Sequence, residues 1–140
     1  FLTQKNIMAN IIALSEAASI GLHSMVLIAR SDETLNVGQI ADKIHSSRHH
    51  VAKVLQRLAK SDYVSSSRGP SGGFTLKADP EKITLLDIFE AIEGKFAVQS
   101  CPADKDTCPF DKKCLLGDLS HSISSEIQNY MSGKTLADYL

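Results

Sequence analysis

Residues 37–77 carry three local patterns that only a few folds can accommodate together. Between Val37 and Lys60, apolar residues recur at helical spacing in two short stretches, which predicts two helices with a tight break at Ser46-Ser47. The serine hydroxyls can accept hydrogen bonds from free N–H groups at the start of the second helix. The predicted inner faces consist of Ile40, Ala41 and Ile44 in the first helix and Val51, Val54, Leu55 and Leu58 in the second. Such a pair is typical of a helix-turn-helix unit.

A β-hairpin is predicted directly after these two helices. Tyr63–Ser67 and Phe74–Lys77 are short runs suited to strands, and the segment between them is rich in glycine and proline. A hairpin in this position would be the wing of a winged helix. Arg68 would lie at its tip beside Gly69, where glycines let the backbone come close to another surface.

Three more helices are predicted outside this block. The first has an apolar face made of Ile11, Leu14, Ala18, Leu22, Met25 and Ala29. The next runs from the capping residue Thr84, with Asp87 three positions on, to Gly94. Its inner face is expected to hold Leu85, Ile88, Phe89 and Ile92. The last runs from Asp118 to Met131, with Leu119, Ile123, Ile127 and Met131 at steps of four.

The expected fold is mainly α with a small β-hairpin: a winged helix-turn-helix domain followed by a long C-terminal dimerisation helix. We expect the DNA-binding domain at residues 8–94, a cysteine-containing loop at 95–117, and the helix with its tail at 118–140. The apolar stripe of the last helix has nothing left in the chain to cover it, which favours packing on a second copy. Packing against the chain's own first helix is the alternative.

Basic residues are concentrated in the predicted helix-turn-helix and wing. The whole chain carries a formal net charge of −1, but residues 43–77 hold seven lysines and arginines and one acidic residue, Asp62, a net charge of +6. This asymmetry indicates a local anion-binding face. A merely solvated surface is the alternative that charge alone leaves open.

The second helix of a helix-turn-helix reads the major groove of DNA with its N-terminal side chains. Arg48 and His49 occupy those positions, while Lys53 and Arg57 are expected to neutralise phosphates. Arg68 would enter a narrow minor groove from the wing. The expected DNA-binding residues are Ser47, Arg48, His49, Lys53, Arg57, Arg68 and Gly69. A dimer of such units would bind double-stranded DNA at a palindromic operator.

The three cysteines, Cys101, Cys108 and Cys114, lie close together in one loop. An odd, clustered set indicates a metal or redox site in a reduced compartment rather than a disulfide framework. Structural zinc sites usually contain C-x2–4-C pairs, so gaps of six and five residues favour an iron–sulfur cluster, with zinc and free thiols as alternatives. Three cysteines leave one ligand missing, for which His121 and His23 are candidates.

Other classes of protein are less consistent with the sequence. No run approaches the roughly 18 apolar residues of a membrane-spanning helix. No signal-peptide pattern is present, so a cytoplasmic protein is expected. A thiol-redox enzyme would usually carry a C-x-x-C pair, and the glycine-rich turn lacks the Gly-Lys-Ser/Thr of a phosphate-binding loop. We therefore expect no enzyme activity.

The stretch Leu14–Leu140 resembles the IscR/NsrR-type winged helix-turn-helix regulators, bacterial repressors and activators linked to iron–sulfur assembly, nitric oxide and redox stress. Ser67–Leu76, with the sequence SRGPSGGFTL, looks like the wing of that family. Ile83–Gly94, ITLLDIFEAIEG, looks like its next helix, and the three cysteines fall where its cluster ligands fall.

The resemblance implies a homodimer whose C-terminal helix crosses over, and a [2Fe-2S] or [4Fe-4S] cluster whose state shifts DNA affinity. Some members have a histidine three residues after the third cysteine, where this chain has Gly117. Others take a carboxylate or a histidine from the partner's first helix. Ser19 stands at the carboxylate position and His23 at the histidine position, so His23 of the partner subunit is the preferred fourth ligand.

Some members of the family lack a cluster and sense metabolites through a partner enzyme. A cluster-free regulator that acts through a partner protein is therefore the main alternative reading, and a thiol-redox enzyme is a more remote one.

Overall fold

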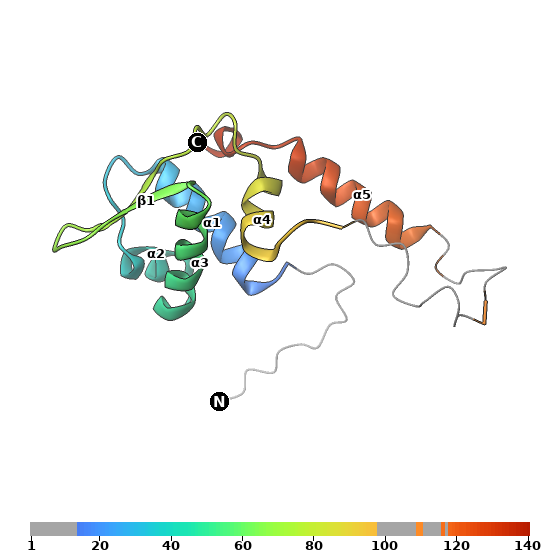
Figure 1. Cartoon of the computed structure of the whole chain (residues 1–140), viewed down its shortest axis with the longest axis horizontal. Coiled ribbons are helices and arrows are strands. Elements are labelled where there is room, and N and C mark those ends of the chain that lie inside the picture. Colours follow the sequence, from blue (N-terminus) through green and yellow to red (C-terminus); the bar gives the residue numbers. More distant parts are fainter. Residues whose placement is uncertain (1–13, 98–108, 111–115, 117) are drawn as a thin grey trace.

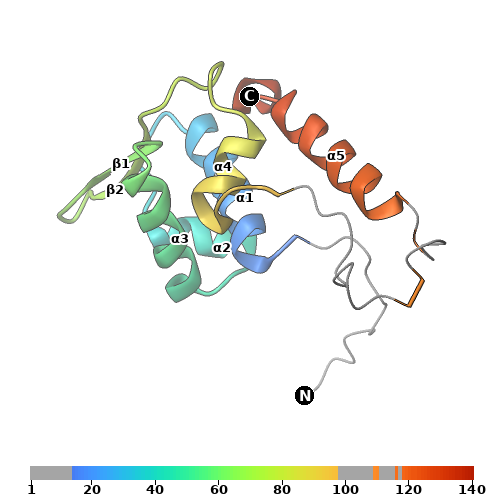
Figure 2. The same ribbon diagram turned by 45° about the vertical axis from the view of Figure 1, so that its right-hand side comes forward.

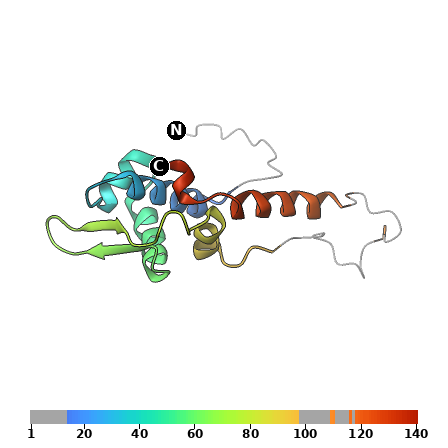
Figure 3. The same cartoon turned by 90° about the horizontal axis from the view of Figure 1, so that it is seen from above.

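The computed structural model describes residues 14–97, 109–110, 116 and 118–140. Its elements are α1 (Glu16–Arg30), α2 (Val37–Ile44), α3 (Arg48–Lys60), β1 (Val64–Ser67), β2 (Gly73–Leu76), α4 (Leu85–Glu93), α5 (Leu119–Ser132) and the 3-10 helix η1 (Leu136–Tyr139). Helices α1 to α4 form one body, the hairpin projects from one side of it, and α5 extends to the other side (Figures 1 and 3). The predicted fold class, mainly α with a winged helix-turn-helix, is confirmed.

The core lies where α1 meets α2, α3 and α4. All four apolar residues predicted for the inner face of α3 are buried. In α2, Ile40 and Ala41 are buried as predicted, while Ile44 is half-buried. In α4, Ile88 and Ile92 are buried, and Leu85 and Phe89 are half-buried. The helical period therefore predicted the packed faces of these three helices well.

Helix α1 differs from its prediction in its start and in its buried face. The predicted Ile11 lies outside the described residues, and the helix begins after Ser15, whose hydroxyl accepts a hydrogen bond from the Ala18 N–H at 3.0 Å. Leu22 and Ala29 are only half-buried. The buried residues are Ala18, Ile20, Gly21, Ser24, Met25 and Ile28. Because α1 contacts helices on more than one side, its buried surface is broader than the predicted stripe.

The hairpin has a backbone partner that the sequence did not predict. Val64 pairs with Leu76 and Ser67 with Gly73 in the antiparallel register. Leu35, in the loop before α2, adds a bridge: its N–H donates to the Phe74 carbonyl at 3.1 Å, and the Phe74 N–H donates back at 2.8 Å. These bonds fix the base of the wing to the start of the helix-turn-helix.

The last residues of the chain are bound back onto the body. The N–H of Leu136 donates to the Ile83 carbonyl, and the N–H of Leu85 donates to the Lys134 carbonyl, both at 2.9 Å. The Leu136 side chain is fully buried. The Nε of Arg30 donates to the Tyr139 carbonyl at 2.7 Å. A hydrogen bond to Tyr130, together with burial, raises the pKa of Tyr139.

In the part of the chain that the structure describes, no helix is both long and apolar enough to span a lipid bilayer.

Candidate nucleic-acid interface and cysteine segment

The start of α3 is built by the break between α2 and α3. His45 ends α2 in the left-handed conformation, with φ 55°, which turns the chain sharply. Ser47 then caps α3, because its hydroxyl accepts a hydrogen bond from the His50 N–H at 3.2 Å. The predicted capping serine is thus confirmed. Its hydroxyl is engaged by the helix, which leaves Arg48 and His49 as the first exposed side chains of α3.

The outer face of α3 consists of His49, Lys53, Gln56 and Lys60, which are all exposed and lie three or four residues apart. The helix contains no acidic residue. Because the opposite face of α3 is buried in the core, the packing of the helix fixes the direction in which this lysine-bearing face is exposed to solvent.

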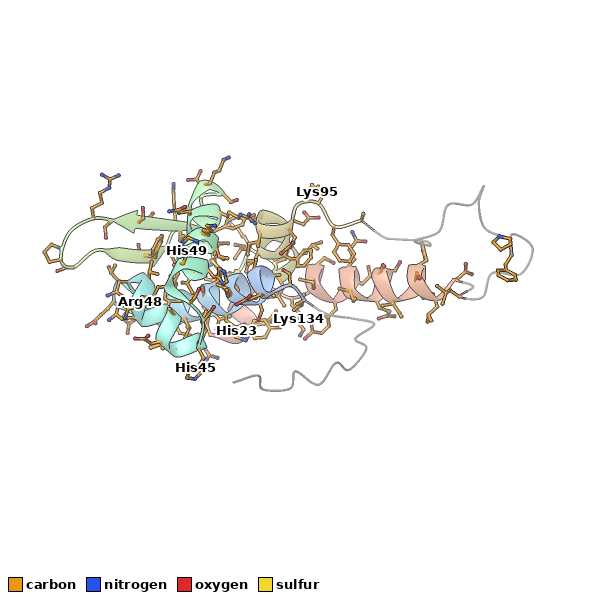
Figure 4. All side chains as sticks on the ribbon, turned by 90° about the horizontal axis from the view of Figure 1, so that it is seen from below. His23, His45, Arg48, His49, Lys95 and Lys134 are labelled. Atoms are coloured by element: carbon orange, nitrogen blue, oxygen red, sulfur yellow. The ribbon has the colours of Figure 1, made fainter. Side chains whose placement is uncertain are left out.

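Arg48 lies at the edge of this face, against α2. A Cβ atom added to Gly38 would come within 3.3 Å of the Arg48 Cζ atom, so the guanidinium rests where α2 has no side chain. Figure 4 labels Arg48 next to α2 and His49 on α3 near the hairpin. The two residues predicted to read bases therefore both lie in the first turn of α3, Arg48 beside α2 and His49 nearer the hairpin.

Arg57 makes a contact within the protein that the sequence did not predict. Its Nη1 donates to the Ile92 carbonyl of α4 at 2.7 Å, across 35 residues of sequence. In the described structure the guanidinium is therefore tied to the end of α4.

The wing tip is shaped by two glycines. Gly69 has a φ of 106°, a conformation that residues with side chains rarely adopt. A Cβ atom on Gly72 would come within 2.5 Å of the Ser67 carbonyl oxygen, and the Gly72 N–H donates to the Gly69 carbonyl at 2.9 Å. Arg68 is exposed beside this tight turn. The predicted position of Arg68 and Gly69 at the tip is thus reproduced.

Two carboxylates lie close to basic side chains of this region. Lys77 Nζ lies 2.8 Å from Asp62 Oδ1, at the base of the wing. His50 Nδ1 lies 3.4 Å from Glu16 Oε1 of α1. Both pairs are largely exposed, so their contribution to stability is small.

His23 lies on the outer face of α1, on the body of the molecule (Figure 4). Its Nδ1 lies 2.7 Å from the Ser19 carbonyl oxygen. A carbonyl can only accept, so Nδ1 carries a proton in this contact, and Nε2 is the ring nitrogen left to act as a ligand. This arrangement is common for histidines that bind metals, because a backbone carbonyl fixes the tautomer and the ring orientation.

A groove of about 660 Å³ runs along this face of α1. Its apolar lining includes Leu22, Val26, Leu27 and Ile44, and Tyr139 also lines it. His23 and Ser19 also line it.

Cys101, Cys108 and Cys114 lie outside the described residues. Among residues 14–97 and 118–140, with the few described between them, no group of three or more His, Cys, Asp or Glu side chains is arranged to hold a metal ion. His121, the other candidate ligand, is exposed in the first turn of α5.

The chain that leaves α4 toward the cysteines is folded back on that helix. Glu90 accepts a hydrogen bond from the Phe96 N–H at 2.9 Å and another from Lys95 Nζ at 3.2 Å. The Phe96 bond and then Lys95 lower the pKa of Glu90. Burial, followed by the charges of Asp87 and Glu90, raises the pKa of the neighbouring Tyr63.

Several contacts of the site were not predicted from the sequence. Nothing in the local pattern indicates that Gly38 receives Arg48 or that Leu35 joins the hairpin. The binding of the last residues did leave a signal, because Thr135 and Asp138 form a capping box with the spacing typical of a helix start.

Three comparisons with known proteins agree on the kind of molecule. A family model named Rrf2, described as iron-dependent transcriptional regulator, matches residues 14–140. An Aquifex aeolicus protein named as an HTH-type transcriptional regulator is 32% identical over 117 residues, 81% of each chain. The HTH-type transcriptional regulator NsrR of Bacillus subtilis is 30% identical over 122 residues, 85% of this chain and 82% of that one.

Solved structures share the fold. CymR of B. subtilis, described as the global cysteine regulator, superposes with a TM-score of 0.73 at 24% identity, covering 91% of this chain and 95% of that one. The T. potens IscR structure gives a TM-score of 0.68 at 22% identity, covering 91% and 85%.

Proposed function

The chain belongs to the Rrf2 family of transcriptional regulators, and from this premise we propose that it binds palindromic operator DNA as a homodimer under the control of an iron–sulfur cluster. The proposal assigns α3 to the major groove and the wing to the adjacent minor groove. It places the protein in the cytoplasm, where DNA and reduced thiols occur together. It assigns the protein no catalytic step.

One observation carries the DNA-binding part of the proposal: the exposed face of α3 carries lysines and no acidic residue. His49, Lys53 and Lys60 share this face, and the helix has no acidic residue to repel phosphates. The wing carries Arg68, which is exposed. Phosphate contacts of this kind supply affinity and base contacts supply sequence preference.

The DNA-binding part is tested with fluorescein-labelled duplexes selected from a random library by the full-length protein. We expect Arg68→Ala to weaken binding and to lower the salt slope by about one, the value for one lost phosphate contact. Ser71→Ala, in the same turn, is the matched control and should bind like the wild type. An Arg68→Ala protein with unchanged affinity and salt slope would reject a wing contact.

The cluster would be held by Cys101, Cys108 and Cys114, with His23 of the partner subunit as the fourth ligand. When bound, it would supply a redox- and nitric-oxide-sensitive centre whose state alters the surrounding protein. Three soft thiolates suit iron, and the family is described as iron-dependent. The tautomer of His23 fits this role, because its Nδ1–H is held by the Ser19 carbonyl and Nε2 is free to bind metal.

The position of His23 also favours a ligand set shared between subunits. His23 lies on the body of the molecule, whereas α5 projects away from the body. The first turn of α5, which follows the cysteine segment in the sequence, is therefore separated from α1 in Figures 1 and 4. A second copy that lays its α5 along the groove of α1 would bring the two together. The apolar lining of that groove supports this arrangement.

The cluster is tested by anaerobic reconstitution followed by absorption and electron paramagnetic resonance spectroscopy. We expect a visible charge-transfer band that Cys108→Ala abolishes and that His23→Ala shifts without abolishing. Ser24→Ala, a change on the same helix away from the groove, is the control for His23. Wild-type protein that stays colourless and iron-free would reject the cluster and favour a regulator acting through a partner protein.

A further inference from the structure

The last turn of α4, Phe89–Glu93, contacts three separate parts of the molecule at once. It holds the chain that leads toward the cysteines, it receives a hydrogen bond from α3, and it packs against α1. Figure 2 shows α4 between α3 on one side and α5 on the other.

The chain that follows α4 is held against this turn by a hydrogen bond from its backbone and by a side-chain contact. Gly94 ends α4 with a φ of 89°, a conformation that residues with side chains rarely adopt. The Phe96 N–H then donates to Glu90 Oε1 at 2.9 Å, and the Phe96 ring meets the Phe89 ring edge to face with centroids 5.8 Å apart. The Glu90 side chain is only 19% exposed, so the hydrogen bond is shielded from water.

On the side of the recognition helix, α3 packs against α4, and one charged hydrogen bond joins α3 to this turn. Arg57 Nη1 donates to the Ile92 carbonyl at 2.7 Å, and this carbonyl belongs to the end of α4, where carbonyl groups lack partners within the helix. Arg57 lies in the last turns of α3, whose first turn carries Arg48 and His49. A shift of the end of α4 therefore acts directly on the helix that would read DNA.

On the side facing α1, packing and one hydrogen bond hold this turn in place. The Ile92 side chain fills the space left by Gly21, where a Cβ atom would be 1.9 Å from Ile92 Cδ1. The Ser15 hydroxyl at the start of α1 donates to the Glu93 carboxylate. Packed side chains of this kind change between discrete arrangements rather than deform continuously.

We propose that the last turn of α4 is the relay that transmits the state of the cysteine segment to α3, with Glu90 and Arg57 as positioning residues at its two ends. Glu90 fixes where the chain toward Cys101 leaves the body, and Arg57 fixes α3 to the same turn. The relay rests on the proposed control of DNA binding by the cysteine segment. It gives Arg57 a role inside the protein rather than on a phosphate.

The relay is tested with the full-length protein and a selected fluorescein-labelled duplex. DNA affinity is measured for cluster-loaded protein and for protein stripped of iron with a chelator, and the ratio of the two affinities is the readout. Glu90→Gln keeps the shape of the side chain and one acceptor oxygen, but it removes the carboxylate charge that pairs with Lys95 and strengthens the hydrogen bond from the Phe96 N–H. Arg57→Met removes the donor to Ile92. Glu81→Gln and Lys60→Met are the charge-matched controls, on the loop before α4 and on the exposed face of α3.

We expect the wild-type and Glu81→Gln affinity ratio to be at least about fivefold, and that of Glu90→Gln and Arg57→Met to fall within about twofold of unity. Lys60→Met should weaken both states alike and keep the ratio. The double variant should lose no more of the ratio than either single variant, because both act on one pathway. Thermal melting of each variant verifies that it is folded.

The possible failures are distinguishable. A wild-type protein with equal affinity in both states rejects the proposed control by the cluster, and the relay with it. A clear wild-type ratio that Glu90→Gln and Arg57→Met leave intact rejects the relay alone. If Arg57→Met instead lowers the salt slope by about one and keeps the ratio, Arg57 is a phosphate contact as the sequence predicted.

A second readout does not involve DNA. Amide hydrogen exchange in α3 should differ between loaded and stripped wild-type protein, and this difference should vanish in Glu90→Gln. Persistence of the difference in that variant would show that the signal reaches α3 by another path and would overturn the relay.

Discussion

At the scale of single residues, the contact between Gly21 and Ile92 decides how closely α1 and α4 approach. Ile92 is 5% exposed, and its Cδ1 occupies the volume that a side chain at position 21 would need. Val54 of α3 lies at the same point, 3.4 Å from the Cβ position. Helices α1, α3 and α4 therefore meet at position 21, where glycine leaves the room that a side chain would fill.

Gly21→Ala is expected to lower the free energy of unfolding by about 1–3 kcal/mol, the usual cost of overpacking a core. The preference of helices for alanine, about 1 kcal/mol, works in the opposite direction, so a loss would report the clash itself. Gly38→Ala is the control, since the atoms nearest to its Cβ would be the flexible end of Arg48 and Asn36 Oδ1, both at 3.3 Å. It should be neutral or stabilising in urea denaturation.

Ile92→Val supplies the decisive comparison for this prediction. Removal of Cδ1 vacates the overlapping volume, so the double variant should be more stable than the sum of the two single effects. Simple additivity of Gly21→Ala and Ile92→Val would mean that the two residues do not collide.

Glu90 gives the molecule a defined response to acid. The Phe96 N–H and Lys95 lower its pKa in the folded state, so its contribution to stability is present above the pKa of the unfolded chain, about 4.3. That contribution is lost as the pH falls through the lower, folded-state pKa. Urea denaturation between about pH 6 and pH 3 should therefore show the stabilities of wild type and Glu90→Gln converging toward low pH. Parallel curves for the two proteins would contradict the assigned hydrogen bonds.

Single residues were predictable from sequence where their partner is near in the chain. Ser47 and Thr84 were assigned as helix caps because a cap acts on an N–H two or three residues away. The hydrogen bond from the Arg57 guanidinium to a carbonyl 35 residues away was not predicted, and the phosphate contact of Arg57 stays a prediction. A helical wheel shows on which side of α3 a residue lies, but not which segment of the chain covers that side.

At the scale of elements, the wing is a short hairpin whose shape depends on its turn. Gly72 lies so close to the backbone of Ser67, Arg68 and Gly69 that any side chain would meet main-chain atoms, which cannot rotate away. The strands on either side are only four residues each. The turn therefore has to be preserved for Arg68 to keep its position.

Gly72→Ala is expected to weaken DNA binding several-fold while the melting temperature changes little, because the tip of the wing is exposed and contributes little to the core. Ser71→Ala, in the same turn, should behave like the wild type. Fluorescence anisotropy with the selected duplex and thermal melting measure the two effects. If Gly72→Ala binds DNA as the wild type does, the wing is not part of the interface.

Whole elements were predicted well when their own periodicity defined them. Helices α2, α3, α4 and α5 and the hairpin were all expected near their observed bounds. The buried face of α1 and the docking of η1 were not, because both depend on neighbours that are distant in sequence. For η1 the burial of Leu136 between Ile83 and the body is decided by tertiary packing, although the capping pattern of Thr135 was visible.

At the scale of the whole molecule, two surfaces with different chemistry are carried on different helices. The outer face of α3 is cationic, and the groove on α1 is lined mainly by apolar side chains. Helix α5 projects beyond the body and carries Leu119 and Tyr130, which are 50% and 60% exposed. The proposed homodimer would cover the groove and α5 while leaving the face of α3 free for DNA.

This separation predicts that dimerisation and DNA contact can be damaged independently. Leu22→Glu places a charge in the apolar groove of α1, where burial by a second copy would cost several kcal/mol, so sedimentation velocity should show mainly monomer. Its affinity for a palindromic duplex should fall toward that for a single half-site. Gln56→Glu instead places a negative charge on the outer face of α3 and should weaken DNA binding through phosphate repulsion while the protein stays dimeric. A Leu22→Glu protein that remains dimeric would move the interface away from the groove, and with it the route by which His23 of the partner subunit could reach the cysteines.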